Sequence, residues 1–459
     1  MQPLLAIAKL TWKAAFRYRL FWVLAVTLLS AVVLLPVVVK DDGTARGLVQ
    51  ILLTYTLSVT SFLLGLSTLW LSCGTLARDV DECQIQMVVV KPVGRWQIWL
   101  GKWLGILALN TALLSLAGVA IYSLLQWRAA SLTPRQQQIL REEVMVARAG
   151  VKPKPPDLNS QIESQLSKIP NRARLSAEEL KAARQHIAER VYLEAQVVGP
   201  RQRHPWEFDL GLSGRLRGNE PLFVRVKFYS ASTNNAGLYE GLWMFATPGS
   251  DIVNQTPSMR LAPDSFQEFQ VPRTMADAQG RLLVVFQSQE DASLVFSLDD
   301  GIEILYRDGG FGLNFFRGLG ILLAWLALLS ALGLAAASIT SFPVAAFFSI
   351  SVLVVAMSSS TLAESVANET VIAGRPEDFQ MIRPVANALF LPLFKGILAM
   401  VNLVNVASPI ELLSTGRSIT WVLLGEAWFQ VVFIAGGVLA VIGIWLLTRR
   451  ELATAQGTH

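Results

Sequence analysis

Long runs of apolar residues constrain the fold of this chain more than any other feature. Six charge-poor stretches approach or exceed the roughly 20 residues that an α-helix needs to cross a bilayer core. They are Leu20–Val39, Leu48–Cys73, Leu104–Gln126, Leu319–Thr340, Pro343–Ser359 and Trp421–Leu447. Hydrophobic residues make up 53% of the chain and charged residues only 16%, which is too apolar for a soluble protein. The sequence therefore predicts an α-helical polytopic membrane protein with about six transmembrane helices.

Basic residues beside the apolar stretches predict the orientation of the chain. The first stretch is longer than the core of a signal peptide, roughly 7–15 residues, and no small-x-small cleavage site follows it. Before it, Lys9, Lys13 and Arg17 recur at helical spacing in an amphipathic segment, which indicates an interfacial helix on the cytoplasmic side of the membrane lipid. The Arg449-Arg450 pair after the last stretch is also expected inside. Both termini are then cytoplasmic, which requires an even number of crossings.

One further apolar segment, residues 386–404, would make the number of crossings odd. It contains Pro392 and Lys395, both unfavourable in a simple span. We therefore expect a re-entrant or interfacial element here rather than a seventh helix.

Two segments of different character form a polar insertion that the topology places outside the cytoplasm. Residues 128–204 are polar, with a helix breaker at 152–156 and a predicted helix that starts at Ser176. In residues 205–312 the apolar residues alternate, which predicts strands. The strands are expected at Leu222–Tyr229, Arg281–Phe286, Ser293–Leu298 and Ile302–Tyr306. The prediction is an α+β extracytoplasmic insertion containing an antiparallel β-sandwich, between a membrane part at 1–127 and another at 313–459.

The chain lacks the sequence patterns of common catalytic and cofactor sites. It contains no phosphate-binding loop, no zinc-binding H-E-x-x-H pattern and no G-x-S-x-G nucleophile turn. Its two cysteines, Cys73 and Cys83, and its three histidines, His186, His204 and His459, do not form a metal-ligand pattern. We expect no catalytic, cofactor or metal site in the chain itself. The net charge of +5 comes from residues beside the spans, so membrane lipid and not nucleic acid is the expected partner.

The segment between the second and third spans, residues 74–97, combines acidic, apolar and basic residues. Its candidate functional residues are Arg78, Asp79, Asp81, Glu82, Lys91, Pro92 and Arg95. The carboxylates offer anionic groups to a basic partner, while Val88–Val90 offer an apolar face and Pro92 ends the short helix. The alternative is a solvated connector with basic residues that reach the lipid headgroups.

The acidic stretch, the Lys-Pro-Val-Gly-Arg turn at 91–95 and the Gly-Lys pair at 101–102 resemble the permeases of the type-2 ABC exporter family. Further points of resemblance are the amphipathic N-terminal segment, Asn314 with Arg317, the Ser-Pro-Ile-Glu segment at 408–411 and the closing Arg-Arg-Glu. The resemblance covers roughly residues 1–127 and 311–453 and not the insertion. Where the family often has Glu-x-Gly-Thr, this chain has Glu-Cys-Gln-Ile at 82–85.

The resemblance implies a function and partners. Segment 74–97 would be the coupling helix that docks into a separate ABC ATPase subunit, which would use ATP and Mg. A second permease copy, or a related permease, would complete the translocation pathway. The resemblance also implies a bacterial inner membrane.

Polar and aromatic residues outside the loop allow several readings. Asn110 and Glu426 lie within spans as pathway or helix-packing candidates. Asn110 is expected to join helices rather than bind cargo, and Glu426 to face a cavity, a partner or the outer interface. Five tryptophans at span ends suggest membrane-interface anchors, namely Trp96, Trp99, Trp103, Trp421 and Trp445. Aromatic residues of the insertion form either its core or a groove for glycan or lipid, namely Trp206, Phe228, Tyr229, Tyr239, Trp243 and Phe245.

An alternative function follows if the insertion is the functional part. The chain would then be a membrane-anchored extracytoplasmic binding or scaffold protein, and its insertion would hold an envelope protein, a glycan or a lipid. About six spans exceed what an anchor needs, and this reading leaves segment 74–97 unexplained.

Overall fold

The computed structural model describes most of the chain in two compact units. The described residues are 2–17, 19–38, 44–81, 93–169, 177–211, 221–230, 237–247, 253–255, 258–272, 275–277, 279–357, 366, 408–450 and parts of 386–399. The first unit, here called the helical unit, comprises Met1–Val146 and Gly310–His459. The second, here called the insertion, comprises Ala147–Gly309. The insertion therefore folds around contacts of its own.

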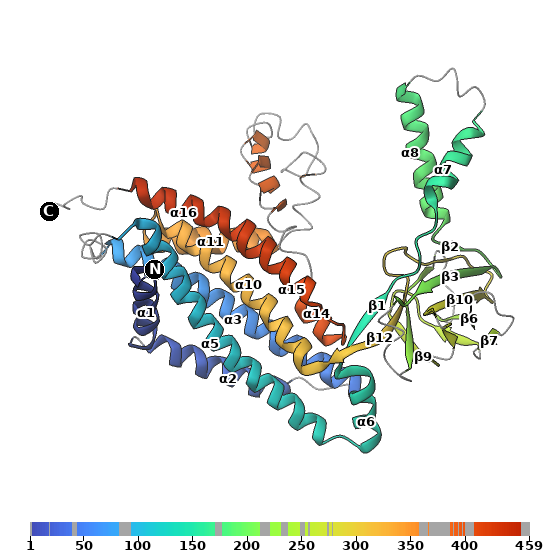
Figure 1. Ribbon diagram of the computed structural model, residues 1–459, viewed down its shortest axis with the longest axis horizontal. Helices are drawn as coiled ribbons and strands as arrows, with labels where there is room; N and C mark the ends of the chain where they lie inside the picture. The colour runs from blue at the N-terminus through green and yellow to red at the C-terminus, as the bar shows by residue number, and fades with distance from the viewer. Residues whose placement is uncertain are drawn as a thin grey trace. The chain divides into compact units, whose positions relative to one another are not determined.

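Long helices that run side by side build the helical unit (Figure 1). Its elements are α1 (Gln2–Arg17), α2 (Leu20–Val38), α3 (Ala45–Asp81), α5 (Arg95–Ala130), α6 (Pro134–Ile139), the π-helix η1 (Leu140–Val144), α10 (Phe311–Ala337), α11 (Phe342–Met357), α14 (Pro409–Ser414), α15 (Trp421–Ala427), the π-helix η4 (Trp428–Gly436) and α16 (Gly437–Arg449). In the described residues, α3, α5, α10 and the continuous stretch Trp421–Arg449 are long and apolar enough to cross a membrane. These helices are those of a membrane protein.

The remaining apolar stretches form less regular elements. α1 and α2 meet at a bend of 65° and count as one further candidate span when taken together, which brings the total to 5. α11 is apolar but has only 16 residues. The structure thus supports four membrane-length helices, and about six crossings stays a prediction. Only parts of the segment 386–404 are described, and a re-entrant or interfacial element there stays a prediction.

Glycines allow α1 to approach α5 closely. A Cβ atom added at Gly101 would lie 2.8 Å from the Cβ of Ile7, and one at Gly105 would lie 2.6 Å from the Cβ of Thr11. The same two helices meet along one face, where Thr11 and Ala15 of α1 are buried. Lys9 lies on the exposed side of α1. Small residues spaced four apart are a common means of packing helices in membranes.

Replacing Gly105 by alanine should loosen the contact between α1 and α5. The new methyl group would meet the Thr11 side chain and, at 2.8 Å, the backbone oxygen of Ala8, which cannot move away as a side chain can. We expect a loss of about 1–3 kcal/mol, as for other overpacked sites, visible as a lower melting temperature in detergent. Gly425→Ala is the matched control, because nothing lies within 4 Å of the added atom. Equal melting temperatures for the two variants would contradict the close contact.

Three separate antiparallel sheets and a pair of helices make up the insertion. Its elements are β1 (Val146–Val151), α7 (Leu158–Ser167), α8 (Ala177–Glu194), β2 (Val197–Val198), β3 (Arg203–Asp209), β4 (Leu222–Val226), β5 (Tyr229–Ser230), β6 (Tyr239–Ala246), β7 (Val253–Gln255), β8 (Met259–Leu261), β9 (Gln267–Val271), β10 (Arg281–Ser288), β11 (Leu294–Val295) and β12 (Ile302–Gly310). The sheets have the orders β1-β12-β4-β9, β3-β10-β6-β7 with β8 beside β6, and β2-β11-β5.

Side chains from all three sheets share one apolar core. Burial alternates strictly along β10, as expected when one face of a strand packs inward. Val224, Trp243 and Leu294, one from each sheet, belong to the same buried cluster. The finer description of these sheets as a β-sandwich stays a prediction.

Strand β1 was missed by the sequence analysis, which expected a polar helical segment over residues 128–204. The helix predicted from Ser176 is present as α8, but Val146–Val151 forms an edge strand beside β12. Its Arg148 is buried and pairs with Glu268 of β9, with Nη1 and Oε2 2.9 Å apart. Because this partner lies far along the chain, no local pattern could indicate it.

Acid should destabilise the insertion through His204 of β3. Burial lowers the pKa of His204 below its ordinary value of 6.5, so the folded state favours the neutral ring. As the pH falls below that value, the unfolded chain binds a proton more readily than the folded one, and stability is lost. We expect a lower melting temperature at pH 5.5 than at pH 7.5, and a smaller difference in His204→Gln. Thermal unfolding of both proteins at the two pH values checks this.

Candidate functional site

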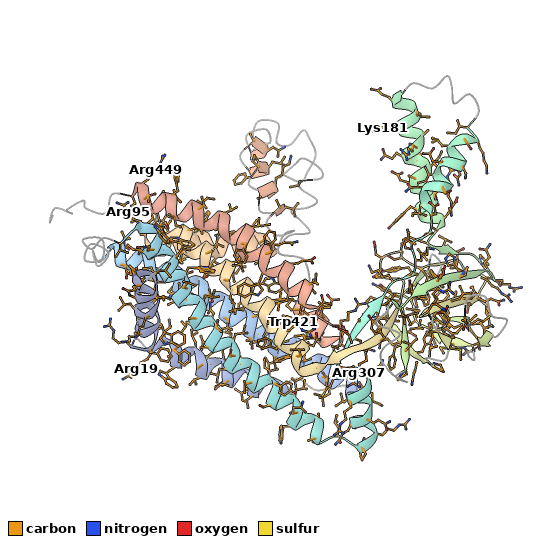
Figure 2. The ribbon with its side chains drawn as sticks, in the orientation of Figure 1. Arg19, Arg95, Lys181, Arg307, Trp421 and Arg449 are labelled. Carbon is orange, nitrogen blue, oxygen red and sulfur yellow. The ribbon has the colours of Figure 1, made fainter. Side chains whose placement is uncertain are left out.

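The predicted coupling residues lie where α3 ends and α5 begins. The structure describes Arg78, Asp79, Asp81 and Arg95, whereas Glu82, Lys91 and Pro92 lie outside the described residues. Figure 2 shows Arg95 and Arg449 at the same end of the helical unit, with Trp421 at the opposite end. We call the first of these the basal end, and the segment 82–92 between the two helices the basal loop.

A partly buried ion pair joins α3 to α5 at the basal end. Lys102 of α5 is 5% exposed, and its Nζ lies 2.5 Å from Oδ2 of Asp79 and 2.7 Å from the backbone oxygen of Thr75. The Asp79 side chain keeps 35% of its surface exposed. In the sequence Lys102 attracted notice only as part of the Gly-Lys pair at 101–102. Its spacing from Asp79 gives no local signal, because the two residues belong to different helices.

The Arg95 side chain binds backbone oxygens at the end of the last helix. Its Nη1 donates to the backbone oxygens of Leu447 and Thr448, each at 2.7 Å, and to that of Arg450 at 3.0 Å. Arg450 in turn donates to the oxygens of Ala337 and Ser338 at the end of α10. Cations are favoured at these positions because the last carbonyls of a helix lack partners and carry partial negative charge.

Two predicted residues remain exposed at the basal end. Arg78 is exposed, and its guanidinium carbon lies 4.9 Å from the ring centre of Phe342. Asp81, at the last position of α3, is also exposed. Asp79 and Asp81 therefore differ in their surroundings, although the sequence presented them as one acidic stretch.

Asn314 and Arg317 hold the chain at the opposite end of the helical unit. The Asn314 side chain donates to the backbone oxygen of Arg417 and accepts from the backbone N–H of Ile419, each at 2.7 Å. Arg317 is buried and donates to the oxygen of Ile419. Asn314 and Arg317 thus hold the start of α10 to the residues between α14 and α15, across about one hundred residues of sequence.

The polar residues within the spans have different environments. Asn110 is buried, and its Oδ1 accepts a hydrogen bond of 3.0 Å from Thr68 of α3, while its Nδ2 has no hydrogen-bond partner among the described residues. Glu426 is exposed on α15. Trp99 is 0% exposed, so it packs against the last helix near Gly443 and does not anchor the chain in an interface as predicted.

A cavity of about 510 Å³ lies between α5 and α10 in the helical unit. Apolar side chains dominate its lining, with Leu114, Phe315 and Leu319 among them, and Tyr122 and Ser115 add hydroxyl groups. Its size falls within the range of small-molecule sites.

The aromatic residues of the insertion mostly form its core. Trp206, Phe228, Tyr239, Trp243 and Phe245 all belong to the buried cluster. Only Tyr229 of the predicted set is largely accessible, at 39%, and it lies 5.1 Å from the ammonium group of Lys227. A groove lined by the other five is not available at the surface.

Comparisons of the chain with protein-family models, with curated proteins and with solved structures find no match. The fold itself defines the class: a membrane protein with an insertion built of antiparallel sheets.

Proposed function

We propose that this chain is the permease subunit of an ATP-binding cassette exporter, which couples ATP hydrolysis in a separate ATPase subunit to movement of a substrate across a membrane. The observation that carries the proposal is the construction of the basal end. A partly buried ion pair joins α3 to α5 close to the basal loop. Arg78 and Asp81, in the last turn of α3, are exposed. A loop with firmly held ends and charged flanks suits docking to a partner of complementary charge.

The proposal includes a topology and further partners. The chain would cross a bacterial inner membrane about six times, with both termini and the basal loop in the cytoplasm. The insertion would then lie on the extracytoplasmic side. A second copy or a related permease would complete the pathway. Exposed apolar residues of the last helix, among them Phe429 and Phe433, would contact that second permease or lipid. ATP and Mg would be bound by the ATPase and not by this chain. The insertion would meet an envelope protein, a glycan or a lipid.

The test is affinity purification from native membranes in mild detergent. The wild-type chain is compared with a variant carrying Asp81→Ala and Glu82→Ala, and the co-purifying proteins and their ATP hydrolysis are measured. We expect an ATPase subunit with the wild type and its loss from the variant. The matched control is Asp157→Ala with Glu163→Ala, two acidic positions of the insertion.

The second candidate is a membrane-anchored binding or scaffold protein, favoured by the separate core of the insertion. Under this proposal no ATPase accompanies the wild-type chain, although the protein is folded. That result would move the function from the basal end to the insertion.

A further inference from the structure

We propose that the cavity between α5 and α10 binds one acyl chain of a membrane phospholipid. The inference goes beyond the proposed function and does not depend on it, because it requires only that the two helices lie in a bilayer. α5 and α10 pack side by side, and the cavity of about 510 Å³ lies where residues 111–123 of α5 face residues 312–323 of α10 (Figure 1). Both stretches belong to helices long and apolar enough to cross a membrane.

The cavity runs along the helices, in the direction that a lipid tail takes beside a transmembrane helix. Its lining extends from Thr111 to Ser123 on α5 and from Gly312 to Leu323 on α10. At a rise of about 1.5 Å per residue, these stretches are about 16–18 Å long. One leaflet of the hydrocarbon core is about 15 Å thick, half of the whole core. The length of the cavity therefore matches that of one acyl chain.

One end of the cavity is closed and the other lies near an exposed tryptophan. Trp103 and Leu107 of α5 pack against a buried cluster from α10 and η4, one turn before Thr111. The Trp103 indole N–H also donates to the backbone oxygen of Ala327 at 3.0 Å. At the other end, Trp127 is exposed one turn beyond the lining, as is typical of the membrane interface. The acyl chain would thus end near Trp103, with its headgroup toward Trp127.

The chemistry of the lining suits a hydrocarbon chain. The hydroxyl of Thr111, at the closed end, donates to the backbone oxygen of Leu107 at 2.8 Å and is not offered to a ligand. The hydroxyls of Tyr122 and Ser123 lie at the open end, where the ester groups of a phospholipid can accept hydrogen bonds. Apolar side chains supply most of the remaining surface, namely those of Leu114, Val119, Phe315, Phe316, Leu319 and Leu323.

Van der Waals fit is what would retain the chain. Lipid tails are as apolar as the lining, so transfer from water supplies no driving force inside a bilayer. An unfilled apolar cavity loses dispersion contacts along its walls, and a tail restores them. A helix about 10 Å across and about 16 Å long occupies roughly 1,250 Å³, more than twice the cavity, so a helix of a second permease does not fit inside.

The experiment uses the full-length chain in phosphatidylcholine vesicles that contain a phosphatidylcholine with a photoactivatable diazirine on one acyl chain. Labelled residues are mapped by mass spectrometry after irradiation, as the mole fraction of the probe is raised. Ser115→Trp fills the cavity from α5, and Gly312→Leu fills it from α10, where an added Cβ atom lies 3.5 Å from the Tyr122 hydroxyl, an ordinary contact.

Each variant has a matched control of the same kind. Leu116→Trp changes an exposed position of α5 that does not line the cavity. Gly425→Leu changes a glycine with nothing within 4 Å of the added atom. Only monodisperse protein is compared. Native mass spectrometry from mild detergent supplies a second readout, the phospholipid retained by each protein.

We expect labelling at residues 111–123 and 312–323 to saturate at a low mole fraction of the probe. It should fall about fivefold or more in Ser115→Trp and Gly312→Leu and in neither control, and the retained phospholipid should be lost with it. Labelling on an exposed apolar face, such as that of Phe347 on α11, should instead rise in proportion to the mole fraction.

Two results would overturn the proposal. One is labelling of the cavity that rises in proportion to the probe, as on the exposed faces, because it would show lipid contact without a site. The other is equal labelling in the cavity-filling variants and their controls. Saturation in the wild-type chain tests the proposal even if both variants fail to fold. Neither readout involves an ATPase, so failure of the proposed function would leave this result unchanged.

Discussion

Replacement of Asp79 by asparagine should destabilise the helical unit by about 3–5 kcal/mol, the usual cost of breaking a buried ion pair from one side. The reason lies in the ammonium group that remains. Lys102 is 5% exposed, and its ammonium group would lose the carboxylate while it still donates to the backbone oxygen of Thr75. Thermal unfolding in mild detergent measures the loss.

The opposite replacement, Lys102→Met, should cost less. It leaves the Asp79 carboxylate, which is 35% exposed and can bind water, and it places an apolar side chain of similar length in the buried position. Asp81→Asn is the control and should change the melting temperature little, as surface substitutions usually do. Equal losses for Asp79→Asn and Lys102→Met would show that burial of the charge is not what determines the cost.

Truncation of Trp243 should have an effect of similar size in the insertion. Trp243 is 0% exposed, and its ring packs against those of Phe269, Phe286 and Phe296, with the Phe286 centre 4.7 Å away. Trp243→Ala removes these contacts and leaves a cavity, for which we expect a loss of about 3–5 kcal/mol. Limited proteolysis of the full chain, with the cuts mapped to 147–309, follows the unfolding.

Tyr229→Ala provides the comparison for this truncation, since it removes an aromatic ring that is 39% exposed. Its effect on proteolysis should be small. Equal resistance of Trp243→Ala and wild type would contradict a shared core, and cuts in the helical unit alone would place the damage in the wrong part of the chain.

The membrane-length helices and several strands could be predicted from the sequence because local composition determines them. A long apolar run has few alternatives to a helix in a bilayer, and alternation along Arg281–Ser288 is the direct result of one buried face. Strand β1 could not be predicted, because its place depends on pairing with β12 and on the distant Glu268. Pairing of this kind leaves no local pattern.

The candidate site was predicted in part for the same reason. Asp79 and Arg95 attracted notice by charge and position, but their partners could not be read from the sequence. Lys102 lies on another helix than Asp79. Arg95 binds backbone carbonyl oxygens, which every residue type has, so the sequence cannot indicate them. Trp99 shows the converse error, because its place near a span end suggested an interface while tertiary packing buries it.

The pairing of β1 with β12 has a consequence for chain connectivity. These strands carry the chain into and out of the insertion, and a Cβ atom added at Gly309 would lie 3.9 Å from that of Ala147 (Figure 1). The two cut ends of a deletion would therefore already be adjacent, and a short turn could join them at small entropic cost. Removal of the insertion from the helical unit, or its exchange for another domain, would consequently require no lengthening of any other part of the chain.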